Sequence, residues 1–165
     1  FSYPVDLSPP AFFGALLGVD MQVAILSMIP AAKVAERVGL KPVVAVGFAV
    51  YALFPVVLIG GPAVLAPVVP LGWAMVLIFA FSGLRFAGLP SHKALIVGPA
   101  KQGAGGRVTG TYYLLRNTIV IPSAALGGAL WEFVSPEVAF TIAAVIGVLG
   151  TGYFLLFGEE FEAYL

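Results

Sequence analysis

The segment PVVAVGFAVYALFPVVLI, residues 42–59, decides the fold class of this chain. It contains no charged side chain and shows no alternation of polar and apolar positions, so a helix built from it has no face that prefers water. A helix needs about 20 mostly apolar residues to cross the hydrocarbon core of a bilayer. The segment therefore predicts a transmembrane helix.

The sequence on either side has the same character. No Asp, Glu, Lys, Arg or His occurs between Lys41 and Arg85, a stretch that is too long for one crossing and suits two. The run Gly60-Gly61-Pro62 predicts the turn between them. Charged, glycine-rich or proline-rich segments bound three further apolar stretches. The five predicted spans cover residues 11–32, 42–59, 70–89, 107–131 and 138–157, with a polar loop at 90–106.

Composition supports this all-α, polytopic interpretation. Of the 165 residues, 61% are hydrophobic and 10% are charged, whereas soluble domains have about 25% charged residues. The formal net charge is zero, so nothing indicates a nucleic-acid partner. With no cysteine and one histidine, we expect no metal site and no cofactor. The expected partner of the chain is the lipid bilayer.

Basic residues predict the orientation. Lys33, Arg37 and Lys41 lie in one connection, and Lys93, Lys101 and Arg107 lie in the next but one, on the same side of the membrane. Cytoplasmic loops are enriched in lysine and arginine. We therefore expect a multi-pass protein of the plasma membrane with its amino end outside and its carboxyl end in the cytoplasm.

Polar residues inside the predicted spans are the candidate functional residues, because a charge at bilayer depth costs at least a few kcal/mol. Asp20 lies near the middle of the first span, with Gln22 on nearly the opposite face. Arg85 lies about one turn from the end of the third predicted span, and Arg116, followed by Asn117, lies within the fourth. These residues are candidates for a translocation path, with Asp20 a possible carrier of a proton or cation.

Structural roles are the alternative. Arg85 could extend to the membrane interface, and Asp20 and Arg116 could make purely structural hydrogen bonds. Spans two and five carry no charge, which favours a bundle in which they face lipid while the others face a cavity. The spacings Gly14-x-x-x-Gly18, Gly106-x-x-x-Gly110 and Ser123-x-x-x-Gly127 predict close helix approaches.

The connection after the first span resembles a signature loop of the major facilitator superfamily, commonly Gly-x-x-x-Asp-Arg-x-Gly-Arg-Lys. Arg37, Gly39 and Lys41 match it, while Ala32, Glu36 and Leu40 depart from it. The stretch from Arg85 to Ile96, then Gly106 to Gly110, Leu115 to Asn117 and Gly127-Gly128, is similar to the carboxyl-terminal half of that family. The similarity in order and spacing covers most of the chain.

The resemblance implies that residues 1–165 form a partial carboxyl-terminal transmembrane domain, whose five spans correspond to helices 8–12 of a twelve-helix transporter. Its partner would be an amino-terminal half that precedes Phe1. The implied activity is secondary active transport of a small solute by rocking two halves around a central site, a mechanism that a proton or another cation can drive. The implied cytoplasmic gating loop contains Ala32, Glu36, Arg37, Gly39 and Lys41.

Two other function classes remain open. A membrane-embedded enzyme could use Asp20 and Arg116 for acid-base chemistry, although no phosphate-binding loop, nucleophile elbow or paired-histidine motif is present. A noncatalytic membrane subunit would need neither. We expect a transporter rather than an enzyme, and the sequence does not select its substrate.

Overall fold

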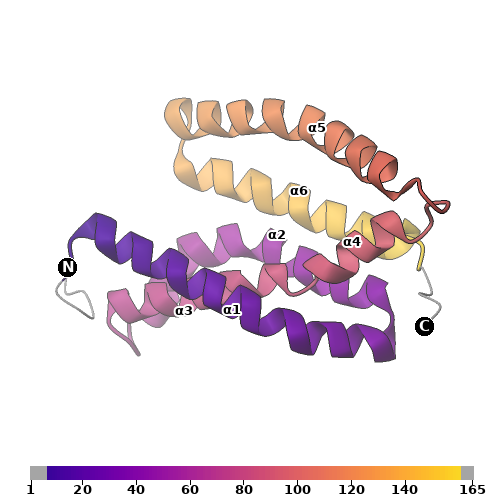
Figure 1. Ribbon diagram of the computed structural model, residues 1–165. Coiled ribbons are helices and arrows are strands. Elements are labelled where there is room, and N and C mark those ends of the chain that lie inside the picture. The colour runs from indigo at the N-terminus through magenta and orange to yellow at the C-terminus, as the bar shows by residue number, and fades with distance from the viewer. Residues whose placement is uncertain (1–6, 161–165) are drawn as a thin grey trace.

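A computed structural model describes residues 7–160, and within them the chain is all-α, with no strand (Figure 1). This confirms the all-α part of the predicted fold class. Six α-helices and one 3-10 turn follow one another along the chain. They are α1 (Pro9–Val38), α2 (Leu40–Leu65), α3 (Leu71–Gly83), η1 (Leu84–Phe86), α4 (Leu89–Val97), α5 (Gly105–Phe133) and α6 (Pro136–Phe157).

The first connection is a single residue rather than a loop. Helix α1 continues beyond the predicted end at residue 32, so Lys33, Glu36 and Arg37 are helical residues of its last turns. Gly39 then separates α1 from α2 with φ +93° and ψ 166°, a backbone conformation essentially restricted to glycine. The predicted loop is therefore wrong, and glycine is needed here to reverse the chain in so little space.

The tail after α6 caps the first turn of α2. The Glu160 carboxylate accepts hydrogen bonds from the backbone N–H groups of Leu40 at 2.7 Å and of Lys41 at 3.0 Å. These N–H groups have no partner inside their own helix, and the positive end of the helix dipole favours a carboxylate. The chain thus ties the end of the last helix to the start of the second.

Helix α2 continues through Gly60-Gly61-Pro62, where a turn was predicted. The small Gly61 lets α3 approach, because a Cβ atom there would lie 2.9 Å from Cδ1 of Ile78. The connection to α3 is instead formed by residues 66–70. Glycine in this sequence thus serves helix packing, and not only chain reversal.

The third predicted span also extends further than its predicted end at residue 89. α3, η1 and α4 form one interrupted segment, Leu71–Val97. Pro90 lies in the first turn of α4, where proline is tolerated, so it begins a helix rather than ending one. The predicted polar loop 90–106 is reduced to residues 98–104, and Arg85 lies at the middle of the segment.

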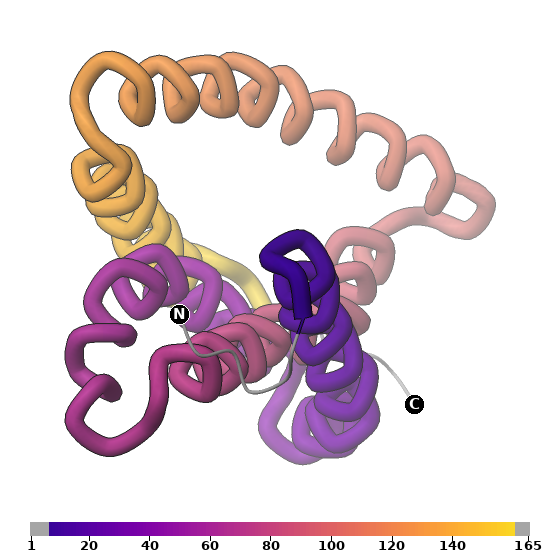
Figure 2. The backbone as a smooth tube through the Cα atoms, turned by 90° about the vertical axis from the view of Figure 1, so that its left-hand side faces the viewer, coloured from indigo at the N-terminus to yellow at the C-terminus, as the bar shows by residue number. Residues whose placement is uncertain are grey.

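Helices α5 and α6 form an antiparallel pair joined by Val134 and Ser135 (Figure 1). The Ser135 hydroxyl accepts a hydrogen bond from the Val138 N–H at 3.2 Å and caps α6. No residue of α5 is buried within the described part of the chain, and α5 contacts α6 and α4. Viewed from the end of the bundle, α5 stands away from the other helices (Figure 2).

Helix α2 is the centre of the remaining bundle. It packs against α1, α3, α4 and α6, and contributes six buried residues. The expectation that spans two and five simply face lipid is therefore too simple, because α2 and α6 each also turn one face toward the interior.

The close approaches occur at glycines other than the predicted ones. A Cβ atom at Gly83 would lie 2.5 Å from the Asp20 carbonyl oxygen, one at Gly88 would lie 2.9 Å from the Val43 carbonyl oxygen, and one at Gly147 would lie 2.8 Å from Cβ of Ala52. Around the predicted glycines, by contrast, nothing within residues 7–160 comes within 4 Å of an added Cβ atom. These are Gly14, Gly18, Gly106, Gly110 and Gly127.

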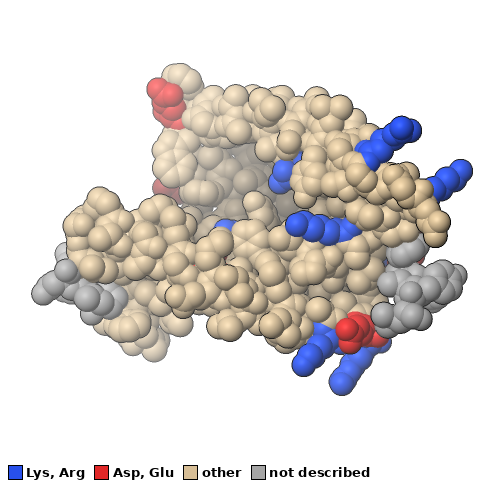
Figure 3. All heavy atoms as spheres, viewed as in Figure 1, with Lys and Arg blue, Asp and Glu red and all other residues tan. Residues whose placement is uncertain are grey.

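Four segments are long and apolar enough to cross a membrane, which indicates a multi-pass integral membrane protein. They are Pro9–Val38, Leu40–Leu65, Leu71–Val97 and Pro136–Phe157. Helix α5, with 29 residues, has the length but is more polar than these four. Lysine and arginine side chains gather toward one end of the molecule, as Figure 3 shows.

Candidate functional site

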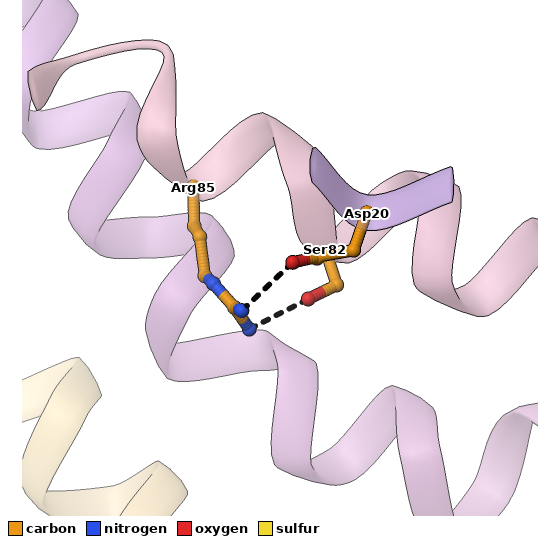
Figure 4. A network of polar contacts seen from close by, with 3 residues as sticks. All are labelled: Asp20, Ser82 and Arg85. Atoms are coloured by element: carbon orange, nitrogen blue, oxygen red, sulfur yellow. Dashed lines mark hydrogen bonds and ion pairs between the residues drawn. The ribbon is translucent and has the colours of Figure 1, made fainter. Parts of the chain in front are cut away.

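A buried ion pair joins the first and third predicted spans. The carboxylate of Asp20, on α1, is 1% exposed, and its Oδ2 lies 3.2 Å from Nη2 of Arg85, on η1 (Figure 4). Nη1 of Arg85 donates a hydrogen bond of 2.6 Å to the hydroxyl of Ser82. Each charge compensates the other, and either charge alone would be costly inside a membrane-spanning bundle.

Aromatic rings surround the guanidinium group. Its Cζ atom lies 4.7 Å from the ring centroid of Phe86, 5.4 Å from that of Phe54 and 5.5 Å from that of Tyr51. Each ring is within the range of a cation–π interaction. The side chain of Arg85 is 19% exposed, so these rings and Asp20 hold it in place inside the bundle. Extension to the interface, the alternative considered from the sequence, does not describe this arginine.

The ion pair retains unused hydrogen-bonding capacity. Oδ1 of Asp20 and Nε of Arg85 are buried and have no hydrogen-bond partner among residues 7–160. A buried polar atom without a partner costs about 1–3 kcal/mol. The pair can therefore rearrange or accept a further partner at less cost than a fully satisfied network could.

Arg85 also lines a cleft of about 680 Å³ between α2, α4, α5 and α6. In Figure 3 this face of the molecule is hollowed, and basic atoms lie at the margin of the hollow. Its walls are mainly apolar and aromatic, and α5 contributes Arg116 to the lining. The polar side chains in the lining are Tyr51, Arg85, His92, Tyr112, Tyr113, Arg116 and Thr151.

One face of α5 borders the cleft. Tyr112, Arg116 and Val120 are spaced four residues apart and lie on the same side of the helix. The Arg116 side chain is exposed, and Nη1 donates a hydrogen bond of 3.3 Å to Oδ1 of the neighbouring Asn117. Within residues 7–160, Arg116 forms no ion pair.

An aromatic and imidazole cluster connects α2, α4, α5 and α6 near the basic end of the helices. The hydroxyl of Tyr112 lies 3.2 Å from Nε2 of His92. The rings of His92 and Phe48 meet edge-on at 5.4 Å, and Phe48 meets Phe154 at 5.2 Å. His92 was predicted to lie in a flexible loop, but it is half-buried and links α4 to α5.

The other predicted site residues lie elsewhere. Gln22 is exposed on α1, and it does not line the cleft. Glu36 and Arg37 are exposed, whereas Ala32, Gly39 and Lys41 are half-buried. No ion pair forms among the charged members of this set within the described residues. The structure thus brings together Asp20 and Arg85 directly, and Arg85 and Arg116 around one cleft.

Sequence reasoning missed the residues that hold Arg85 and shape the cleft. Ser82 could have been recognised, because it lies one helical turn before Arg85. Tyr51 is the one hydroxyl-bearing side chain in the otherwise apolar segment 42–59. The phenylalanines gave no signal, since aromatic side chains are common throughout a membrane helix.

The chain offers no multidentate metal site among residues 7–160, because no three His, Asp or Glu side chains gather there. Comparisons with protein-family models, curated proteins and solved structures find no match to this chain. The features of this chain that point to a function are therefore the ion pair, the cleft and the long apolar helices.

Proposed function

We propose that this chain is part of a secondary transporter that moves a small solute across the membrane by alternating access, and that it corresponds to the carboxyl-terminal half of a major facilitator protein. The observation that carries the proposal is the buried Asp20–Arg85 pair, whose arginine lines a cleft inside a bundle of membrane-spanning helices. Charged residues at membrane depth mark substrate and ion pathways in transporters.

The proposal includes a fifth crossing by α5. This helix runs antiparallel to α6, which is itself apolar enough to span (Figure 1). At about 1.5 Å per residue, its 29 residues are long enough for the hydrocarbon core. Some of its polar residues lie on the face that borders the cleft. This explains why α5 is less apolar than the other four segments.

In this mechanism the ion pair is the coupling element. An ionised Asp20 attracts Arg85, whereas a protonated Asp20 no longer compensates its charge. Proton binding at Asp20 would therefore free Arg85 to interact with solute in the cleft. The exposed Glu36 and Arg37, with the half-buried Lys41, would act separately, as a cytoplasmic clamp in one state of the transport cycle.

The test is solute uptake by the protein reconstituted in proteoliposomes, screened with and without a proton gradient. We expect Asp20→Asn to abolish gradient-driven uptake, because an amide cannot carry the proton, while the helical circular dichroism of the protein is kept. Glu132→Gln is the matched control, since it makes the same chemical change at an exposed residue outside the cleft. Its uptake should equal that of the unsubstituted protein.

Normal gradient-driven uptake by Asp20→Asn would contradict the coupling role. Chemical conversion of a solute, with no net movement, would favour the membrane-embedded enzyme. If neither uptake nor conversion occurs for any solute, the noncatalytic subunit becomes the better interpretation.

A further inference from the structure

The lining of the cleft carries positive charge and no negative charge within the described residues. Two arginines line it, and no carboxylate is among its lining residues within the part of the chain that the structure describes. Asp20 lies behind the wall and compensates Arg85. Among residues 7–160, Arg116 has only the neutral amide of Asn117 as its hydrogen-bond partner, so one positive charge remains without a counter-charge there.

The lining also has a clear chemical character. Phe48, Tyr51 and Phe86 are ring-bearing walls, and Val44 and Val120 add aliphatic surface. A volume of about 680 Å³ is within the roughly 300–1,000 Å³ typical of small-molecule sites. A bare inorganic ion would leave most of this apolar surface without contact.

A cationic solute fits the cleft poorly. The rings of Tyr51 and Phe86, which could otherwise bind a cation, already surround the guanidinium of Arg85. A further positive group would be repelled by Arg116, whose charge is not compensated by a carboxylate of the described residues, and the repulsion is stronger in a low-dielectric site than in water.

We propose that the cleft binds a small organic anion with an apolar, ring-sized body, with Arg116 as its charge-binding residue and the aromatic walls as the contact surface for its body. As a statement of substrate class, this inference rests on the proposed transport function. Tyr112, one turn from Arg116 on the same face of α5, can donate its hydroxyl proton to the same anionic group when Nε2 of His92 is the donor in their 3.2 Å contact. An arginine and a carboxylate can form two parallel charge-assisted hydrogen bonds, which gives geometric specificity as well as affinity.

The test compares three probes that share a benzene ring and differ in charge: benzoate, benzyl alcohol and benzylamine. Binding to the protein in phosphatidylcholine nanodiscs is measured by titration calorimetry. Benzoate should bind more tightly than either of the other probes. Arg116→Gln should weaken benzoate binding about tenfold or more, the loss expected for a charge-assisted hydrogen-bonded pair.

The controls separate a site from a general charge effect. Arg107→Gln removes a charge from an exposed residue of the same helix outside the cleft, so it should leave benzoate binding unchanged. Arg116→Lys keeps the charge but cannot form the paired hydrogen bonds, and its affinity should be intermediate. Equal affinity for benzylamine, absence of benzoate binding, or an equal effect of Arg107→Gln and Arg116→Gln would overturn the proposal.

Two further comparisons distinguish a site for a soluble anion from a lipid-headgroup site, and anion binding from transport. If phosphatidylglycerol in the nanodisc abolishes benzoate binding at every benzoate concentration, the cleft is a lipid-headgroup site and the proposal for a soluble anion is wrong. If benzoate binds through Arg116 but no solute is taken up by proteoliposomes, the binding inference holds and the transport function fails. If proteoliposomes take up cations but the protein does not bind benzoate, the transport function holds and the organic-anion inference fails.

Discussion

Asp20 and Arg85 depend on one another for their stability at this depth. Removing one partner of a buried ion pair leaves the other charge uncompensated, which typically costs about 3–5 kcal/mol. We predict that Arg85→Ala lowers the free energy of unfolding by about 3 kcal/mol, near the lower end because a fifth of the arginine side chain remains exposed. Thermal unfolding in detergent, followed by circular dichroism, measures this loss as a lower Tm.

A double variant distinguishes charge from packing. Asp20→Asn combined with Arg85→Gln removes both charges and keeps two polar side chains, so most of the lost stability should return. If the double variant is as unstable as Arg85→Ala, the pair contributes by shape and not by charge. Arg37→Gln, at an exposed position, should leave Tm unchanged.

The candidate residues could be selected from the sequence one by one, but not their pairing. The cost of a charge in hydrocarbon identifies Asp20, Arg85 and Arg116 without any knowledge of the fold. Asp20 and Arg85 are 65 positions apart, however, and only the packing of α1 against α3 and η1 brings them together. The misplaced end of the third span also put Arg85 near the interface, which concealed its central position.

At the scale of helices, the interrupted segment Leu71–Val97 is held between α1 and α2 by glycines. Gly83 contacts the backbone of α1 so closely that a methyl group would overlap the Asp20 carbonyl and the side chain of Val23. We predict that Gly83→Ala lowers the free energy of unfolding by about 1–3 kcal/mol, the usual cost of overpacking. Thermal unfolding in detergent checks this, and uptake should fall as α1 and its aspartate are displaced.

Gly14→Ala is the matched control on α1. Nothing described lies within 4 Å of a Cβ atom at Gly14, so alanine adds helix propensity without overlap and should raise stability by about 0.5–1 kcal/mol. A similar loss for both variants would show that Gly14, as the Gly14-x-x-x-Gly18 spacing predicted, does take part in close helix packing.

Helix existence was predictable, whereas helix ends were not. Long apolar runs fix where a membrane helix must lie, and each predicted span contains or overlaps an observed helix. The observed ends differ from the predicted ones at Lys33–Lys41, Gly60–Pro62 and Pro90, where charge, glycine and proline predict helix ends. In the structure, α1 continues through Lys33 to Val38. Gly61 lies inside α2 and packs against Ile78, and Pro90 lies in the first turn of α4.

At the scale of the whole molecule, the basic residues set a direction for the bundle. The end of α1, the connection between α4 and α5, and the end of α6 lie together at one end, and the connections 66–70 and 134–135 lie at the other (Figure 1). The positive-inside tendency predicts that the first of these ends is cytoplasmic. Because the chain contains no cysteine, single cysteines introduced into it can report the side of the membrane without background.

We predict that Val68→Cys reacts with a membrane-impermeant maleimide on intact cells, whereas Lys101→Cys reacts only after permeabilisation. Both positions are exposed and lie in connections at opposite ends of the bundle.

Val134→Cys, between α5 and α6, decides whether α5 crosses the membrane. It should react like Val68→Cys if α5 spans and like Lys101→Cys if α5 lies along the cytoplasmic surface. The second outcome would leave Arg116 at the interface, where water and salt weaken its attraction for an anion, and the organic-anion cleft would lose its low-dielectric setting.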